Sequence, residues 1–209
     1  MNKKRAGIIF IVFGLVMIAA SVFFQLGYNK REAAASQHSS LMLEEFKASE
    51  VRPATTPEPQ INIPDEKEED IVYPEMATAD YYGLAMIGII RAPSCGVELP
   101  VLSDWSYTML EYAPCRYSGN IYAGDLILMG HNYSCHFKPL KKLEIGAEVE
   151  FEDANGTIWK YRVDEIDSIH RNDVDALPSD HELILFTCEE YGVYRFVARC
   201  NLVETVELD

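Results

Sequence analysis

The feature that most restricts the fold of this chain is an uncharged stretch near its N-terminus. Residues 6–29 carry no charged side chain, and residues 7–24 are almost entirely apolar. Because an α-helix rises ~1.5 Å per residue, about 20 such residues cross a ~30 Å hydrocarbon core. The alternative, a cleaved signal peptide, has an apolar region of only ~7–15 residues. We therefore predict a retained transmembrane helix at residues 7–28, preceded by a cytoplasmic tail at residues 1–6.

Charge is distributed unevenly around this stretch. Residues 1–31 hold five basic and no acidic side chains, whereas residues 32–72 hold three basic and ten acidic ones. Because basic residues favour the cytoplasmic side, we predict a single-pass protein of the cell membrane with its N-terminus in the cytoplasm and its C-terminal part outside. The net charge of −15 argues against nucleic acid as a partner, since phosphates need a basic surface.

Composition divides the rest of the chain into a linker and a folded unit. Residues 29–71 are rich in Ala, Ser, Pro and Glu and hold few large apolar side chains. Such a segment cannot bury enough apolar surface to order itself. We expect a flexible, acidic, proline-rich linker there, with a helical turn or two at residues 41–46. Residues 72–209 are then the folded domain.

The predicted domain consists of short apolar runs separated by turns. The runs at residues 147–151 and 158–166 alternate apolar and polar side chains and flank the hairpin-turn sequence Asp153-Ala154-Asn155-Gly156. Many short strands at this spacing indicate a mainly β domain, either a closed barrel or a sandwich. Further strands are predicted at residues 83–91, 97–102, 125–129, 183–188 and 194–203, and short helices at residues 106–112 and 137–143.

Two of these strands lead to residues that could act in catalysis. Cys188 ends the strand at residues 183–188, and Gly130-His131 follows the strand at residues 125–129. A thiol at the end of a strand is held rigidly yet stays reachable, as a nucleophile must be. Either residue could instead simply cap a buried strand. Gly130 would let another part of the chain approach the backbone closely.

The strand after Cys188 carries two candidate arginines. Alternation puts Arg195, Val197 and Arg199 on one face and the apolar side chain of Phe196 on the other. If the apolar face packs on the core, Arg195 projects outward beside the end of the preceding strand. The alternative is a solvated or salt-bridged arginine, because the predicted domain contains 23 acidic residues.

In their order along the chain, these features resemble the sortase family of Gram-positive cell-surface transpeptidases. The resemblance covers residues 87–203, behind a single N-terminal anchor. The family's usual signature reads Thr-Leu-x-Thr-Cys, and Ile184 stands here in place of the first threonine, which leaves the subclass open. Papain-like enzymes, caspases and the cysteine transpeptidases that act on D-amino-acid stems differ in residue order or in the residues around the cysteine. The matching segments are Gly130-His131, Leu185-Phe186-Thr187-Cys188 and Arg195 after Tyr191-Gly192-Val193.

This resemblance implies a closed sortase-type β-barrel of about eight strands with one or two short helices. It implies that Cys188 attacks the threonine carbonyl of a Leu-Pro-x-Thr-Gly-like sorting signal and that His131 exchanges protons with the leaving and incoming amines. Arg195, ahead of Arg199, would stabilise the oxyanion or hold the substrate backbone. The partners implied are surface proteins with such a signal, and the thioacyl intermediate would pass to an amine such as a peptidoglycan precursor or a pilin lysine.

Two other functions are compatible with these residues. One is a non-catalytic, membrane-tethered β-domain that binds a wall component or a partner protein, although such a module has no reason to keep His131, Cys188 and Arg195 together. The other is a cysteine peptidase that only hydrolyses, which would form as much product without an added amine as with one.

We expect no cofactor. Cys135 and His136 lie near His131, but no Cys-x-x-Cys or His-x-x-x-His pair is present to anchor zinc. Some sortases bind calcium, and an acidic run offers oxygen ligands, but its spacing matches no established calcium loop and an acidic surface is the simpler interpretation. That run comprises Glu148, Glu150, Glu152 and Asp153.

The four cysteines other than Cys188 could be paired or free. Outside the cytoplasm four cysteines could form two disulfides, but they could equally be apolar thiols, and we favour unpaired thiols. Residues 70–74 lack the Asp-Pro-aromatic motif of the lid found in pilin-polymerising sortases. The four cysteines are Cys95, Cys115, Cys135 and Cys200.

Overall fold

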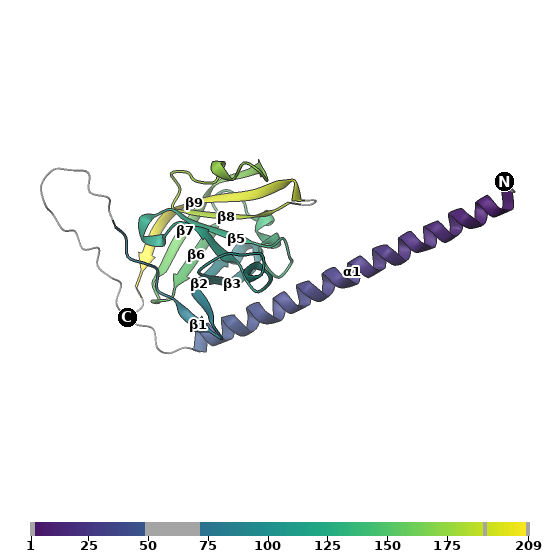
Figure 1. Cartoon of the computed structure of the whole chain (residues 1–209). Helices are drawn as coiled ribbons and strands as arrows, with labels where there is room; N and C mark the ends of the chain where they lie inside the picture. Colours follow the sequence, from purple (N-terminus) through teal and green to yellow (C-terminus); the bar gives the residue numbers. More distant parts are fainter. Residues whose placement is uncertain (1–2, 49–71, 190–191, 208–209) are drawn as a thin grey trace, which may run out of the picture.

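The computed structural model describes residues 3–48, 72–189 and 192–207. A long helix, α1 (Lys3–Ala48), runs past a β-domain that lies against its C-terminal half (Figure 1). Within the part of the chain that the structure describes, α1 is the one helix long and apolar enough to cross a membrane, and its apolar stretch is not buried in the protein.

Helix α1 continues well beyond the predicted membrane span. Residues 29–48 are helical, where the sequence predicts a linker with a turn or two at residues 41–46. The remainder of the predicted linker, residues 49–71, lies outside the described residues. Good helix formers such as Ala, Leu, Met and Glu are frequent in residues 32–48. Contact with the domain adds to this propensity, because one face of this half of the helix is buried.

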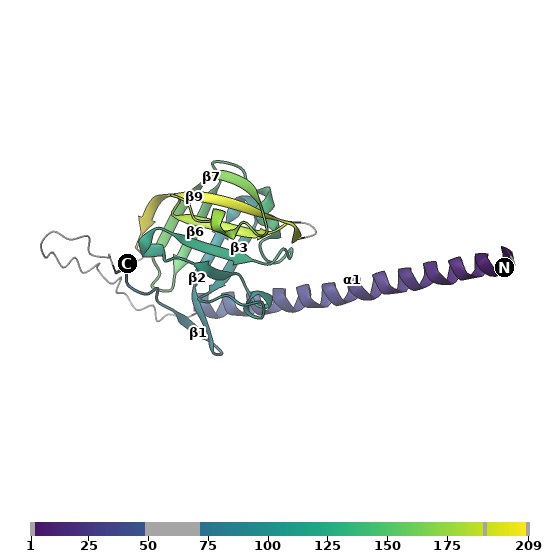
Figure 2. The ribbon, with the colours of Figure 1, turned by 45° about the horizontal axis from the view of Figure 1, so that its top comes forward.

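The domain is a sheet that curls until it closes on itself (Figures 1 and 2). Over the described residues the strand order is β1-β2-β3-β4-β5-β8-β9-β7-β6, and an additional pairing of β2 with β6 closes a ring of eight strands with β1 outside it. This arrangement confirms the predicted mainly β, barrel-like fold. The strands are β1 (Ala79–Tyr81), β2 (Leu84–Ala92), β3 (Val97–Leu102), β4 (Cys115–Ser118), β5 (Leu126–Gly130), β6 (Glu148–Asp153), β7 (Ile158–His170), β8 (Leu183–Cys188) and β9 (Tyr194–Val206).

The sequence predicts seven of these strands and does not predict β1 or β4, which are too short for a recognisable alternation. The predicted helices at residues 106–112 and 137–143 are shorter 3₁₀ turns, η2 (Met109–Glu111) and η4 (Lys138–Lys142). Further 3₁₀ turns are η1 (Pro93–Cys95), η3 (Ile121–Ala123) and η5 (Val174–Ala176).

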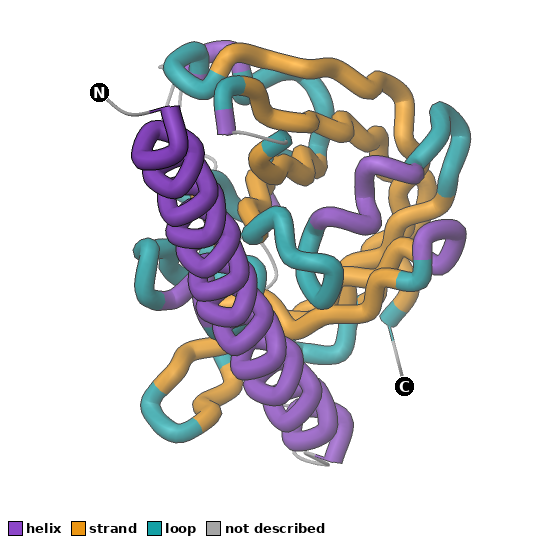
Figure 3. The backbone as a smooth tube through the Cα atoms, turned by 90° about the vertical axis from the view of Figure 1, so that its right-hand side faces the viewer, coloured by secondary structure: helices purple, strands orange, loops and turns teal. Residues whose placement is uncertain are grey.

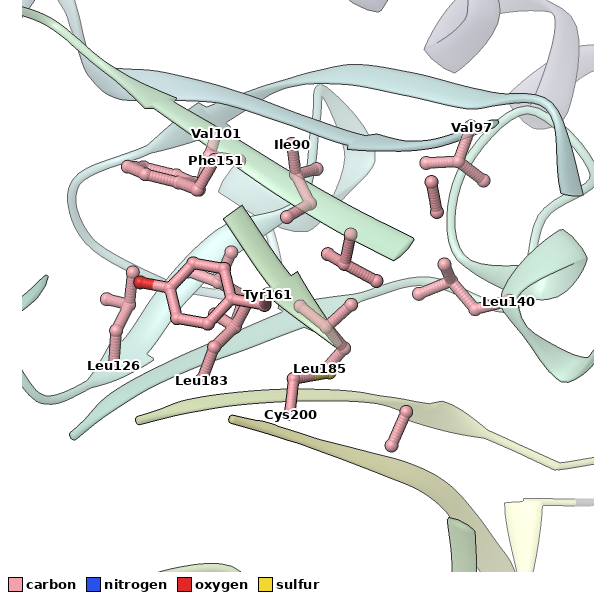
Figure 4. Packing of buried hydrophobic residues seen from close by; sticks show 14 of the residues in the cluster. Ile90, Val97, Val101, Leu126, Leu140, Phe151, Tyr161, Leu183, Leu185 and Cys200 are labelled. Carbon is pink, nitrogen blue, oxygen red and sulfur yellow. The ribbon is translucent and has the colours of Figure 1, made fainter. Parts of the chain in front are cut away.

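Two apolar clusters hold the domain together, one on each face of the sheet. The inner cluster fills the ring, where side chains from neighbouring and from opposite strands meet, among them Ile90, Phe151 and Leu185 (Figure 4). The outer cluster covers the other face of β2, β5, β8 and β9, and α1 contributes Met42 and Phe46 to it. Figure 3 shows α1 crossing the domain on this side. Because residues 183–187 of β8 and 196–200 of β9 are buried, these parts of the two strands are held firmly.

The predicted hairpin turn joins β6 to β7 and is stabilised by a buried carboxylate. Asp153 is 3% exposed, and its Oδ1 accepts hydrogen bonds from the backbone N–H groups of Asn155 (2.9 Å) and Thr157 (3.0 Å). Its Oδ2 accepts one from the indole N–H of Trp159 (3.2 Å). The turn therefore depends on a single acceptor side chain.

A second buried polar group links the domain to α1. His136 is 1% exposed, and its Nε2 lies 3.1 Å from the Ser39 hydroxyl, which donates to the carbonyl oxygen of Tyr112 at 2.7 Å. Since the hydroxyl proton is used toward Tyr112, Nε2 must donate to Ser39. Burial lowers the pKa of His136 to about 4, with a further lowering by the nearby His131, so His136 is neutral at pH 7.

Replacing Asp153 by Ala should destabilise the domain by about 1–3 kcal/mol, because buried N–H donors lose their acceptor. The free energy of unfolding, measured by urea denaturation of the full chain in detergent, checks this. Glu148→Ala, on the exposed part of the same strand, is the matched control and should change it by less than ~0.5 kcal/mol. Equal effects of the two substitutions would contradict the role of the turn.

Acidification should destabilise the fold through His136. The unfolded chain takes up a proton near pH 6.5 and the folded chain only near pH 4, so the free energy of unfolding should fall as the pH drops through that interval. The expected loss is about 3 kcal/mol, and His136→Gln should remove it. Denaturation curves at several pH values measure this, with the exposed His38→Gln as control. A slope unaltered by His136→Gln would refute the assignment.

Candidate functional site

The ends of β5 and β8 lie side by side and bring His131 close to Cys188. The two strands are parallel and in register, with Gly130 paired to Thr187. The buried Thr187 hydroxyl donates to the carbonyl oxygen of Gly130 at 2.8 Å, which ties the two strand ends together. His131 and Cys188 are the next residues on these neighbouring strands. Pairing of β5 with β8 therefore places them at the same edge of the sheet.

Arg195 lies on the neighbouring strand, directly opposite Cys188. In the antiparallel pair of β8 and β9, Cys188 and Arg195 are register partners, so their side chains emerge on the same face. The Arg195 guanidinium lies over the Phe186 ring, 5.4 Å from its centroid, and its Nε donates to the carbonyl oxygen of Arg171 at 3.4 Å. These contacts hold the cation beside the half-buried thiol.

Arg199, the rival of Arg195, is four residues away along β9 and fixed elsewhere. It pairs with Ile184 and is only 6% exposed. Its guanidinium donates to the Glu165 carboxylate at 3.2 Å and to the carbonyl oxygen of Ala176 at 2.9 Å. The face that carries both arginines is therefore not open to solvent along its length, since the outer cluster covers it beyond Arg195.

The three residues line one cleft of about 470 Å³. Sequence reasoning did not identify its other walls, which come from loops and strand ends distant in the chain. The rings of Tyr107 and Tyr117, which both contact Trp105, line the cleft, and so does Arg171, a second basic residue. The lining residues are Trp105, Tyr107, Leu110, Tyr117, Met129, Gly130, His131, Arg171, Asn172, Cys188, Gly192 and Arg195.

His131 is held by two residues that sequence reasoning also missed. Its Nε2 lies 3.8 Å from the Glu111 carboxylate, and its ring stacks at 4.7 Å on Tyr133, whose hydroxyl is 3.4 Å from the same carboxylate. Burial lowers the pKa of His131, and Glu111 partly opposes this. Among the described residues, no group hydrogen-bonds the buried Nε2, which faces the Glu111 carboxylate.

A close packing contact explains Gly130. A Cβ at this position would lie 2.6 Å from the Phe137 ring, so only glycine lets the fully buried Phe137 pack under the start of the His131 loop. We define the His131 loop as residues 131–137. The loop is closed by a hydrogen bond from the Phe137 N–H to the carbonyl oxygen of His131 at 3.1 Å.

The candidate metal ligands do not assemble in the part of the chain that the structure describes. No group of three or more His, Cys, Asp or Glu side chains suited to a metal ion occurs there, either around His131 or on β6. In the acidic run of β6, Glu152 pairs with Arg91 at 2.6 Å and Asp153 holds the hairpin turn.

All five cysteines are free thiols in the structure, and Cys188 is the one that lines the cleft. Burial raises the pKa of Cys115 and of Cys200 to about 12, so both stay protonated at neutral pH. Burial also raises the pKa values of Cys95 and Cys135. These four thiols are therefore poor nucleophiles.

The chain matches known proteins over the segment that builds this cleft. A family model described as the sortase domain matches residues 90–203, more than half of the chain. Sortase A of Listeria monocytogenes serovar 1/2a (strain ATCC BAA-679 / EGD-e) is 27% identical to this chain. The alignment covers 100% of this chain and 95% of that protein.

Solved structures share the fold. A crystal structure of Listeria monocytogenes sortase A gives a TM-score of 0.54 at 24% identity, covering 59% of this chain and 91% of that one. Sortase A of Corynebacterium diphtheriae gives 0.53 at 23% identity, covering 60% and 63%, and a Clostridium perfringens sortase D5 transpeptidase gives 0.51 at 22%, covering 57% and 79%. The match to the sortase-domain model over more than half of the chain shows that this chain belongs to the sortase family.

Proposed function

We propose that this protein is a membrane-anchored cysteine transpeptidase in which Cys188 is the nucleophile, His131 the general acid and base, and Arg195 the oxyanion-stabilising residue. The observation that carries the proposal is the strand pairing that gathers these residues. The β5–β8 register sets His131 beside Cys188, and the β8–β9 register sets Arg195 opposite Cys188, all on one cleft.

In the proposed first step, the Cys188 thiolate attacks the threonine carbonyl carbon of a Leu-Pro-x-Thr-Gly-like sorting signal. The carbonyl π electrons move to oxygen and form an oxyanion. When the oxyanion collapses, the Thr–Gly C–N bond breaks, and the glycine amine leaves with a proton from His131. The product is a thioester between Cys188 and the threonine.

In the second step, an amine attacks the thioester carbonyl and gives a proton to His131. The C–S bond breaks, Cys188 leaves as a thiolate, and a new amide joins the substrate protein to the acceptor. We propose a surface protein as substrate and a peptidoglycan precursor or a pilin lysine as acceptor. The helix α1 would anchor the enzyme with its N-terminus in the cytoplasm and its domain outside.

The electrostatics of the cleft favour these roles. The Arg195 guanidinium can bind the oxyanion, because the oxyanion carries negative charge. The lowered pKa of His131 means that its imidazolium gives up a proton readily, although that form is a minority at pH 7. Arg199 cannot take the place of Arg195, since its donors are engaged with Glu165 and Ala176.

The Cys188→Ala variant should form no transpeptidation product and keep its fold, because the thioester cannot form. The measurement is mass spectrometry of a sorting-signal peptide panel incubated with candidate amines. Cys95→Ala, which alters a half-buried thiol outside the cleft, is the control and should stay active. Product from Cys188→Ala, or none from wild type with any signal, would contradict the proposal.

The same assay separates the two alternatives. A hydrolytic peptidase would release as much cleaved peptide without an amine as with one. A non-catalytic binding domain would retain a peptide or a wall fragment without cleaving it, and Cys188→Ala would leave that binding unchanged.

Arg195→Ala should lower kcat by ~10²–10³-fold, because one oxyanion donor is lost, while iodoacetamide should still alkylate Cys188. Arg195→Lys keeps the charge and should retain part of the activity. The matched control is Arg199→Lys, which should lower stability and leave turnover per folded molecule nearly unchanged. Steady-state kinetics and thermal denaturation measure both quantities. A larger loss of turnover from the Arg199 substitution would reverse the assignment.

A further inference from the structure

The C-terminal half of α1 presents one continuous stripe to the domain. Its members follow each other at alternating spacings of four and three residues, which places them on one face of a helix. Ala35 and Met42 are 0% exposed, Ser39 is 3% and Phe46 is 6%. The stripe consists of Tyr28, Glu32, Ala35, Ser39, Met42 and Phe46.

The N-terminal part of this stripe contacts the His131 loop. The Glu32 carboxylate accepts hydrogen bonds from both the backbone N–H and the hydroxyl of Ser134. The Tyr28 hydroxyl is 3.4 Å from the carbonyl oxygen of Asn132, and the Tyr28 ring meets that of Tyr133 edge to face at 5.6 Å.

Further contacts fasten the end of the loop. The Cys135 thiol lies 3.5 Å from the Glu32 carbonyl oxygen. His136 donates to Ser39, as described above, and the Phe137 N–H returns a hydrogen bond to the carbonyl oxygen of His131. Every residue from 132 to 136 therefore touches α1, and the loop is closed on the backbone of His131.

The helix also contacts the other segment that holds His131. Ser39 donates to the carbonyl oxygen of Tyr112, and the His38 ring lies 4.8 Å from the Tyr112 ring. Tyr112 directly follows Glu111, whose carboxylate faces Nε2 of His131. Both side chains around the imidazole, Tyr133 and Glu111, thus belong to segments packed against α1.

We propose that the docked half of α1 is a positioning element, which sets the His131 imidazole for proton transfer at Cys188. The proposal rests on the proposed function for the role of His131. In this proposal, the docking of α1 joins the membrane anchor and the active site in a single packed unit. Undocking the helix would let the loop open, hydrate His131 and move its Nε2 away from the reacting bond.

The test uses the full chain in lipid vesicles and a double variant, Glu32→Ala with Ser39→Ala, which removes the side-chain hydrogen bonds of these two residues while α1 stays helical. We expect amide hydrogen exchange at residues 132–137 to accelerate and kcat to fall about 10-fold or more at unchanged KM. The pKa of His131, followed by NMR of its imidazole, should rise toward 6.5 as burial is lost.

The matched control is Ser36→Ala with Glu44→Ala, the same residue types on the exposed face of the same helix, which should change none of these quantities. Glu32→Gln keeps an acceptor oxygen and should retain most of the wild-type kcat. Unchanged exchange in the double variant, or faster exchange with kcat and the His131 pKa unchanged, would overturn the positioning role. If wild type forms no product, the proposed function fails, while exchange and titration still decide whether α1 positions His131.

Discussion

The parallel pairing of β5 with β8 is the constraint on which the cleft depends. Parallel strands place their carboxyl ends at the same edge of a sheet, so residues 57 positions apart in the chain become neighbours. The Thr187 hydroxyl donates a hydrogen bond to the carbonyl oxygen of Gly130 and links the two strands at this edge. Because this hydroxyl is buried, it cannot bond to water instead. A slip of one residue in this register would turn the Cys188 and His131 side chains to opposite faces.

Packing on both faces of the sheet makes this edge rigid. Residues 183–186 of β8 and 196–198 of β9 contribute alternately to the inner and the outer cluster, so the segments next to Cys188 and Arg195 have little freedom. The two arginines of β9 show the consequence. Arg199 is buried and bound to fixed partners, whereas Arg195, at the strand end, reaches the cleft. Alternation puts both arginines on one face of β9, and their positions along the strand give them different environments.

The contacts of α1 extend this argument from the domain to the N-terminal helix. An isolated helix in water is marginal, and the half of α1 beyond the apolar stretch gains its stability from the buried stripe. The partners of that stripe are the segments around His131. Docking of α1 and the geometry of the cleft therefore depend on the same contacts. One of them is the hydrogen bond between the buried, neutral His136 and Ser39, which tolerates little rearrangement.

The sequence by itself determined the apolar helix, seven strands, the Asp153 turn and three candidate residues, because these follow from local charge, alternation and motif order. Tertiary structure decided what depends on distant contacts. It extended α1 to Ala48 and surrounded His131 with Glu111 and Tyr133. The residues of the stripe from Tyr28 to Phe46 have helical spacing in the sequence, but Ala35 and Ser39 among them are too small or too polar to indicate a buried face. The stripe is buried only because the domain surface packs against it, and the sequence of one segment does not show which surface it will contact.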